Sequence, residues 1–356
     1  ESFGTRMSKG KLALGLDIGS SSIKMVMLKE SRRGYRLEAF GMAPLPPEAI
    51  VDGSLMDSSV VVQAIGEILA SQRVRRKEVA TGVSGRAVNI KKLSLPSMTK
   101  QELEESLRWD LENYIGTQAD GLYADAAILS DGEDGQMDVL LVAAKKDIIS
   151  DYVLALSEAG LKAAVVDVDG IAAQNAVEMV HGFDDVSTVA VINIGASVTS
   201  VNIVSRGVTA FTRDVTVGGN LITEEIQKDL GISYEEAEAL KIGGRAGEDA
   251  DAIIPHEVER VIAQVSGQIA GEIQRSLDFY ANPLNARFDK IYLSGGTAKI
   301  PALQRIIADR SGAPVEVFNP FAGLQVDQKR FDPMYLEDVG PLAAVAVGLG
   351  LRRVEA

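Results

Sequence analysis

An internal repeat constrains the fold of this 356-residue chain more than any other feature. Three strand-like runs, Leu12–Asp17, Ile23–Glu30 and Tyr35–Gly41, open the chain, with a serine-rich turn and a glycine turn between them. Residues 188–215 repeat this order of strands and turns, with Asn193 in the place of Asp17. The two positions are 176 residues apart, about half of the chain, so we expect two lobes built on one plan.

Composition excludes several classes of protein. The chain has no cysteine and only two histidines, His181 and His256, so disulfides and zinc clusters are excluded, and any metal must be held by oxygen. A formal net charge of −14 disfavours binding to nucleic acid or anionic lipid. The apolar run Val339–Leu351 is too short to span a bilayer, and no stretch resembles a signal peptide. We therefore expect a cytoplasmic protein with at least two domains.

Hydrophobic periodicity predicts that each lobe is interrupted by an insertion. The first insertion is a small α/β module, and the second is helical. The expected elements are a helix over 58–71, a strand over 79–83, a helix over 98–115, strands over 124–129 and 137–143, a helix over 147–159, a strand over 165–168, a crossover helix over 170–179, helices over 221–240 and 255–280 with a loop over 243–251, a strand, Gly-Gly turn and helix over 291–307, and an apolar helix over 339–351. The last helix can pack closely against the crossover helix.

Two turns, Asp17–Ser22 and Asn193–Thr199, are rich in small hydrogen-bond donors. A tight turn of glycine and serine points several backbone N–H groups to one side, which suits phosphate oxygens. Two such turns can face each other and hold the β- and γ-phosphates of a nucleotide, with Lys24 adding a positive charge and Asp17 holding the waters of Mg²⁺. Neither turn has P-loop or dinucleotide-fold spacing. An ordinary hairpin turn is the alternative for residues 17–22 alone.

Together with Val217-Gly218-Gly219 and Ser294-Gly295-Gly296-Thr297, these turns resemble the phosphate-1, phosphate-2 and adenosine motifs of the actin-like ATPase superfamily. Within it, the inserted module is similar to those of FtsA, a cell-division family, and of PilM, a type IV pilus assembly family. Three features favour PilM: the segment GLDIGSSSIK, residues 218–241, and the ending at Ala356 without the amphipathic membrane helix of FtsA. The resemblance implies an α/β fold in which two duplicated actin-like lobes enclose a nucleotide cleft. The implied subdomains are 1A (7–92, 162–186 and 336–356), the inserted 1C (93–161), 2A (187–228 and 284–335) and 2B (229–283).

The resemblance also implies which residues hold ATP and Mg²⁺. Phosphates are expected to contact Gly19, Ser20, Ser21, Ser22 and Lys24, with an opposing clamp of Gly195, Ala196, Ser197 and Thr199. The nucleoside is expected near Glu238 and Lys241, the ribose or phosphates near Gly219, and the other side of the adenosine near Gly295, Gly296, Thr297 and Lys299. Mg²⁺ is expected near Asp17 and, through water, Asn193. An exposed ion pair of Glu238 with Lys241 and a plain strand-to-helix turn at Gly295-Gly296 are the alternatives.

The residues for hydrolysis depart from the superfamily pattern. Asp169 lies where relatives have a Glu or Gln that positions the attacking water, so it is the candidate general base, with Asp167 second. Either residue could instead cap the crossover helix. Relatives usually have an acidic residue at the position of Asn193, and an amide there loses the charge. We therefore expect ATP to be bound with slow or negligible turnover, as a conformational switch.

The resemblance to PilM implies a role in type IV pilus assembly. The expected partner is the cytoplasmic N-terminal peptide of the membrane protein PilN, bound as an extended chain in a groove between the first domain and the inserted module. Pilus motor ATPases and a second copy of the chain are further possible partners. The protein would then be peripheral to the inner membrane through its partners. An FtsA-like filament-forming protein and, less favoured, a small-molecule kinase of the same fold are the alternatives.

Overall fold

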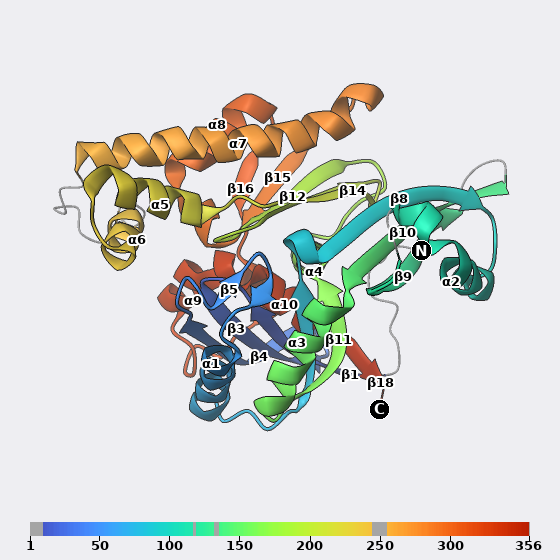
Figure 1. The fold of residues 1–356 in the computed structure, drawn as a ribbon, viewed down its shortest axis with the longest axis horizontal. Helices are drawn as coiled ribbons and strands as arrows, with labels where there is room; N and C mark the ends of the chain where they lie inside the picture. The colour runs from blue at the N-terminus through green and yellow to red at the C-terminus, as the bar shows by residue number, and fades with distance from the viewer. Residues whose placement is uncertain (1–9, 117–118, 132–134, 244–254, 356) are drawn as a thin grey trace.

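The computed structural model describes residues 10–116, 119–131, 135–243 and 255–355 as two lobes, each built on a central sheet (Figure 1). The first sheet has the strand order β11-β7-β2-β3-β4-β17, and the second has the order β14-β13-β12-β15-β16. The bounds of these strands are β2 Leu14–Ile18, β3 Ser22–Ser31, β4 Gly34–Pro44, β7 Glu78–Val83, β11 Lys162–Val168, β17 Leu324–Gln325, β12 Thr188–Ile194, β13 Thr199–Ser205, β14 Val208–Val215, β15 Lys290–Ser294 and β16 Val315–Val317.

Helices cover the sheets, and short elements join them. The helices are α1 Ser58–Ser71, α2 Lys100–Ile115, α3 Lys146–Glu158, α4 Asp169–His181, α5 Gly219–Leu230, α6 Tyr234–Gly243, α7 His256–Leu284, α8 Pro301–Ser311, α9 Pro333–Val339 and α10 Ala344–Gly350, with 3₁₀ turns η1 Gly85–Ala87, η3 Gly296–Lys299, η4 Pro320–Gly323 and η5 Gly340–Ala343. The remaining strands are β1 Gly10–Leu12, paired with β18 Arg353–Glu355, the hairpin β5 Ile50–Val51 and β6 Ser54–Leu55, and a third sheet of β8 Val88–Pro96, β10 Gln136–Lys145 and β9 Leu122–Asp131.

The duplication predicted from the sequence is confirmed in the strand register. In the first lobe, β2 and β3 are antiparallel and Asp17 lies opposite Lys24. In the second lobe, β12 and β13 are antiparallel and Asn193 lies opposite Ser200, so the offset of the sequence repeat is also the offset of the cross-strand pairs. Each first strand then pairs in parallel with a strand beyond the meander, β7 in one lobe and β15 in the other. The glycine turns of both lobes therefore lie at the ends of equivalent inner strands, β2 and β12.

Several predicted elements differ from the observed ones. The single helix predicted over 221–240 is two helices, α5 and α6, because Gly231 adopts a left-handed conformation (φ +64°) that ends α5. The apolar run 339–351 begins as the 3₁₀ turn η5 and becomes α-helical at Ala344. Residues 244–251 of the predicted loop lie outside the described residues.

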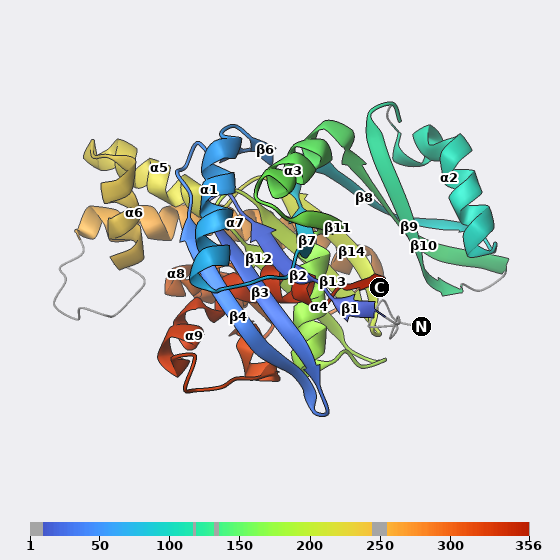
Figure 2. The same cartoon turned by 90° about the horizontal axis from the view of Figure 1, so that it is seen from below.

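The packed unit nearest to the range 93–161 expected for the inserted module begins with β8 at Val88. It consists of α2 packed on the sheet β8-β10-β9, and it lies at the opposite end of the molecule from α5 and α6 (Figure 2). Helix α3 falls within the predicted range, but its buried residues Ile148, Tyr152 and Leu156 join the core of the first lobe. In the second lobe, α7, which falls mostly in the range 229–283 expected for subdomain 2B, packs on the sheet in one core.

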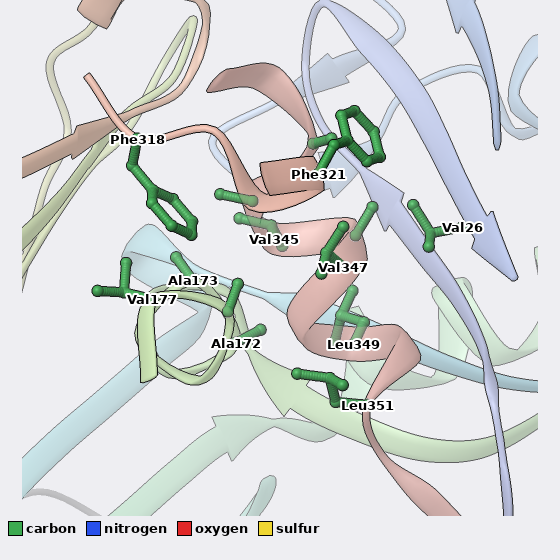
Figure 3. Close-up of a cluster of buried hydrophobic side chains, with 14 of the residues drawn as sticks. Val26, Ala172, Ala173, Val177, Phe318, Phe321, Val345, Val347, Leu349 and Leu351 are labelled. Carbon is green, nitrogen blue, oxygen red and sulfur yellow. The ribbon is translucent and has the colours of Figure 1, made fainter. Parts of the chain in front are cut away.

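The core between the lobes is built on close contact of α4 with α10, as the sequence predicted. Ala172 of α4 lies on the side of α10 in Figure 3, and a Cβ added at Gly348 would lie 1.7 Å from the carbonyl oxygen of Ala172. On its other side α10 packs against β2 and β3, while α4 packs against β12 and β13. The two helices therefore join the sheets of both lobes. Within the described ranges, no helix is both long enough and apolar enough to cross a bilayer.

Candidate functional site

A cavity of about 450 Å³ lies where the glycine turns of the two lobes meet. Its volume falls within the range of small-ligand pockets. Sixteen of the site residues predicted from the sequence line it: Asp17, Gly19, Ser20, Ser21, Ser22, Lys24, Asp169, Asn193, Gly195, Ala196, Ser197, Glu238, Lys241, Gly295, Gly296 and Thr297. The fold thus collects at one place residues from both sheets and from the helical insertion.

The two glycine turns have the same local structure and contact each other. In the first, the Gly19 N–H donates to the carbonyl oxygen of Ser22 (3.2 Å), and in the second the Gly195 N–H donates to that of Val198 (2.9 Å). Between the lobes, the Ser197 hydroxyl donates to the Ser20 hydroxyl at 2.8 Å. The turns therefore face one another, which is the arrangement that two opposing phosphate-binding loops require.

Asp17 and Lys24 form a charged pair on the first-lobe side of the cavity. The Lys24 Nζ lies 3.3 Å from the Asp17 carboxylate and also donates to the Ser22 carbonyl oxygen at 3.2 Å. Only 7 % of Asp17 is exposed, so this pair is shielded from solvent. An ammonium group held beside a glycine turn is a suitable partner for a phosphate oxygen.

On the second-lobe side, the equivalent pair is uncharged. The Asn193 Oδ1 accepts a hydrogen bond from the Ser294 hydroxyl at 3.1 Å and faces the same cavity as Asp17. In the described part of the chain, no group of three or more acidic or histidine side chains is arranged to hold a metal ion alone. Mg²⁺ is commonly held by one or two carboxylates together with phosphates and waters, so Asp17 and Asn193 fit an ion that arrives with a nucleotide.

Asp169 begins α4 and points into the bottom of the cavity. Burial raises the pKa of its carboxyl to about 8, the Asp17 carboxylate acts in the same direction, and a hydrogen bond from the Ser84 hydroxyl opposes both. Gly82 on β7 makes room for this side chain, since a Cβ there would lie 1.9 Å from the Asp169 Oδ1. The N-cap of α4 is Val168, and the Asp167 carboxylate accepts a hydrogen bond from the Val168 N–H at 2.8 Å, so a capping role stays open for Asp167.

Tyr152 of α3 completes the wall around Asp169. Burial, followed by the Asp169 and Asp17 carboxylates, raises the pKa of its hydroxyl, so Tyr152 stays protonated. Tyr152 and Ser84 were not predicted from the sequence, because the sequence pattern places α3 in the inserted module and Ser84 belongs to no motif. The hairpin β5–β6 was also missed, although Asp52 and Gly53 line the cavity.

At the other end of the cavity, a buried Lys241 pairs with a partly exposed Glu238, which differs from the fully exposed pair left open as an alternative. The Lys241 ammonium pairs with Glu238 and donates to the Thr223 hydroxyl (2.7 Å) and to the carbonyl oxygen of Gly219 (3.2 Å). Only 2 % of Lys241 is exposed. A lysine so enclosed fixes α6 against α5 and leaves the Glu238 carboxylate at the cavity wall.

Four candidates from the sequence do not line this cavity. Thr199 is buried and donates to the Val217 carbonyl oxygen. Gly219 leaves space for the Thr297 side chain, since a Cβ at Gly219 would lie 2.4 Å from the Thr297 hydroxyl. Lys299, expected to line the adenosine, pairs instead with Asp338. Asp167, the second candidate base, pairs with Arg352 and faces a different cavity.

That second cavity is a groove of about 950 Å³ between the inserted module and the first lobe. One wall is formed by β9 and by alternate residues of β10, and the other by β11, one face of α4 and the turn before β18. Among the described strands, β9 pairs only with β10, and β11 pairs only with β7, so both are edge strands. Edge strands offer unpaired backbone N–H and C=O groups to an extended peptide.

Comparison with known proteins identifies the family. Over residues 15–354, the chain matches the family described as type IV pilus assembly protein PilM. The chain belongs to this family. A solved structure described as a PilM-PilN type IV pilus biogenesis complex contains a chain with a TM-score of 0.85 and 30% identity to this PilM-family protein, covering 97% of this chain and 99% of that one.

More distant relatives are similar over most of the chain. The FtsA cell-division proteins of Neisseria meningitidis serogroup B and Bacillus subtilis are each 24% identical, over 85% and 94% of this chain and 84% and 83% of their own lengths. The ethanolamine utilization protein EutJ of Carboxydothermus hydrogenoformans has a TM-score of 0.55 at 17% identity, over 98% of this chain and 92% of its own. The actin-like fold expected from the resemblance is confirmed.

Proposed function

We propose that this PilM-family protein binds ATP with Mg²⁺ between its glycine turns and holds the cytoplasmic N-terminal peptide of PilN in the 950 Å³ groove, linking the inner-membrane complex to the pilus motors. The observation that carries the proposal is the similarity, at 30% identity and over nearly the whole length, to a chain of a PilM-PilN complex. A large groove flanked by two edge strands supports binding of an extended peptide.

The nucleotide is assigned to the smaller cavity. Its phosphates fit between the turns at Gly19–Ser22 and 195–198, where they would replace the direct hydroxyl contact between Ser20 and Ser197. Lys24 supplies the positive charge. Bound Mg²⁺ would supply further charge neutralisation of the phosphates, and Asp17 and Asn193 carry the oxygens that face it. The Glu238 carboxylate lies where it can accept hydrogen bonds from a ribose.

Slow turnover is part of the proposal. A general base must be deprotonated to accept a proton, and burial holds the pKa of Asp169 at about 8, so this carboxyl is mostly protonated at neutral pH. Asn193 adds no negative charge on the opposite side. These features favour a nucleotide that holds the two lobes in one arrangement over one that is rapidly consumed.

The proposal is tested by isothermal titration of the purified protein with a synthetic peptide of the PilN cytoplasmic N-terminal segment from the same organism, with and without Mg-ATP. We expect binding in both conditions, and tighter binding with Mg-ATP. The variant Ala124→Trp fills the groove from an exposed position on β9 and should abolish binding, whereas Ala70→Trp, exposed on α1 outside both cavities, should not. Peptide binding that is equal in both variants and the wild type would exclude the groove.

FtsA-like filament formation is the second candidate, supported by the similarity to FtsA proteins over most of their length. It predicts nucleotide-dependent assembly in the absence of any PilN peptide. Sedimentation of the protein with Mg-ATP and lipid vesicles measures this directly. A protein that stays in the supernatant at all nucleotide concentrations is not a filament former of this kind.

A further inference from the structure

Glu178 stands out among the residues that line the groove. It lies on the face of α4 that carries Ile171, Asn175 and Met179 into the groove, while the opposite face of the helix packs in the core. The side chain is half-buried. Burial alone raises the pKa of Glu178, with no opposing contribution from a cationic side chain. Among the described residues it has no hydrogen-bonded or ion-paired partner for its carboxylate.

The other charged groups of the groove are already neutralised or exposed. Asp167 pairs with Arg352, and Arg353 pairs with Glu30. Asp125 of β9 is exposed and accepts a hydrogen bond from the following backbone N–H at 2.8 Å. Glu178 is therefore the carboxylate in this part of the structure that is both desolvated and uncompensated. A desolvated charge without a partner costs free energy that an arriving opposite charge recovers.

We propose that Glu178 is the specificity-determining residue of the groove and pairs with a lysine or arginine side chain of the bound peptide; this inference rests on the peptide-binding function proposed above. Short cytoplasmic segments beside a membrane span carry an excess of Lys and Arg, so a membrane-anchored partner supplies this chemistry. Apolar side chains of the groove, including Ile171 and Met179, then surround the pair and exclude water from it. Backbone pairing with the edge strands would bind many extended peptides, and Glu178 would select among them by charge.

A double-mutant cycle tests this pairing. Wild-type protein and Glu178→Gln are each titrated with the PilN peptide and with versions in which each Arg is replaced by citrulline and each Lys by norleucine, one at a time. We expect one replacement, and likewise Glu178→Gln, to weaken binding about tenfold, with no further loss when both changes are combined. Glu158→Gln, exposed on α3 and outside both cavities, is the matched control and should change affinity less than about twofold.

Each outcome of the cycle has a distinct meaning. Independent, multiplicative losses, or full affinity of every uncharged peptide for the wild type, overturn the role of Glu178 and leave the groove function intact. An N-acetylated peptide distinguishes the remaining source of positive charge: if acetylation alone removes the dependence on Glu178, the carboxylate binds the terminal ammonium and the side-chain pairing is wrong. If no peptide binds the wild type, the proposed function itself fails. The peptide replacements measured on wild-type protein test the pairing even if Glu178→Gln does not fold.

Discussion

Replacing Asp169 with asparagine should stabilise the protein, and increasingly so as the pH rises. The pKa of the folded Asp169 is raised to about 8 from its ordinary value of 3.8. Between these values the folded state keeps a proton that the unfolded state has lost, so the free energy of unfolding falls as the pH rises and levels off above pH 8. The slope is about 1.4 kcal/mol per pH unit. Between pH 6 and pH 8 the wild type should therefore lose about 2 kcal/mol that Asp169→Asn keeps.

This figure is an upper limit, because the carboxyl faces the cavity and retains some contact with water. For a chain of 356 residues it corresponds to a difference of about 3 °C in Tm. Thermal unfolding of nucleotide-free wild type and Asp169→Asn is measured at intervals from pH 6 to pH 8. Asp57→Asn is the control, because hydrogen bonds at the start of α1 lower the pKa of Asp57 and move its titration far below this range. Parallel Tm curves for wild type and Asp169→Asn would refute the reasoning.

Two further perturbations test the core and the phosphate site. Gly348→Ala should destabilise the protein by about 3 kcal/mol in thermal or chemical unfolding, since its Cβ would meet the Ala172 backbone at 1.7 Å. Gly66→Ala, open to solvent on α1, should stabilise the protein slightly. Equal effects of the two changes would contradict the observed packing. Lys24→Gln should weaken binding of a fluorescent ATP analogue at least about tenfold, while Lys29→Gln, exposed on the same strand, should not. Equal affinities of the two variants for the analogue would show that Lys24 does not belong to the phosphate site.

The glycine turns could be predicted from the sequence because they depend on local structure and on the repeat. A strand followed by glycine and small hydroxyl residues determines its own turn, and a second copy at a fixed offset implies the same turn in the second lobe. The contact of α10 with α4 was predictable for a similar reason, since alanine and glycine at helix positions allow close approach.

Predictions that depended on contacts between distant residues were less successful. Lys299 stands next to the adenosine motif in sequence, but Asp338 on α9 offers it an ion pair outside the cavity. Asp167 and Asp169 are indistinguishable by pattern, but Asp167 lies in β11 and pairs with Arg352, whereas Asp169 begins α4 and lines the other cavity. Tyr152 contributes to the cavity because α3 packs on the first lobe. The sequence did not indicate this packing, because α3 directly follows the strands of the inserted module.

The two lobes differ in the charge that they bring to the cavity. The duplication places Asp17 opposite Lys24 in one lobe and Asn193 opposite Ser200 in the other, on two sides of one cavity. A second charged pair at Asn193 and Ser200 would add two more ions to a site that already contains Asp17, Lys24 and Asp169, each with its own desolvation cost. With a neutral second lobe, the Asp17–Lys24 pair on the first side faces uncharged donors across the cavity. The two turns meet at the hydroxyl contact between Ser20 and Ser197, where no like charges oppose each other.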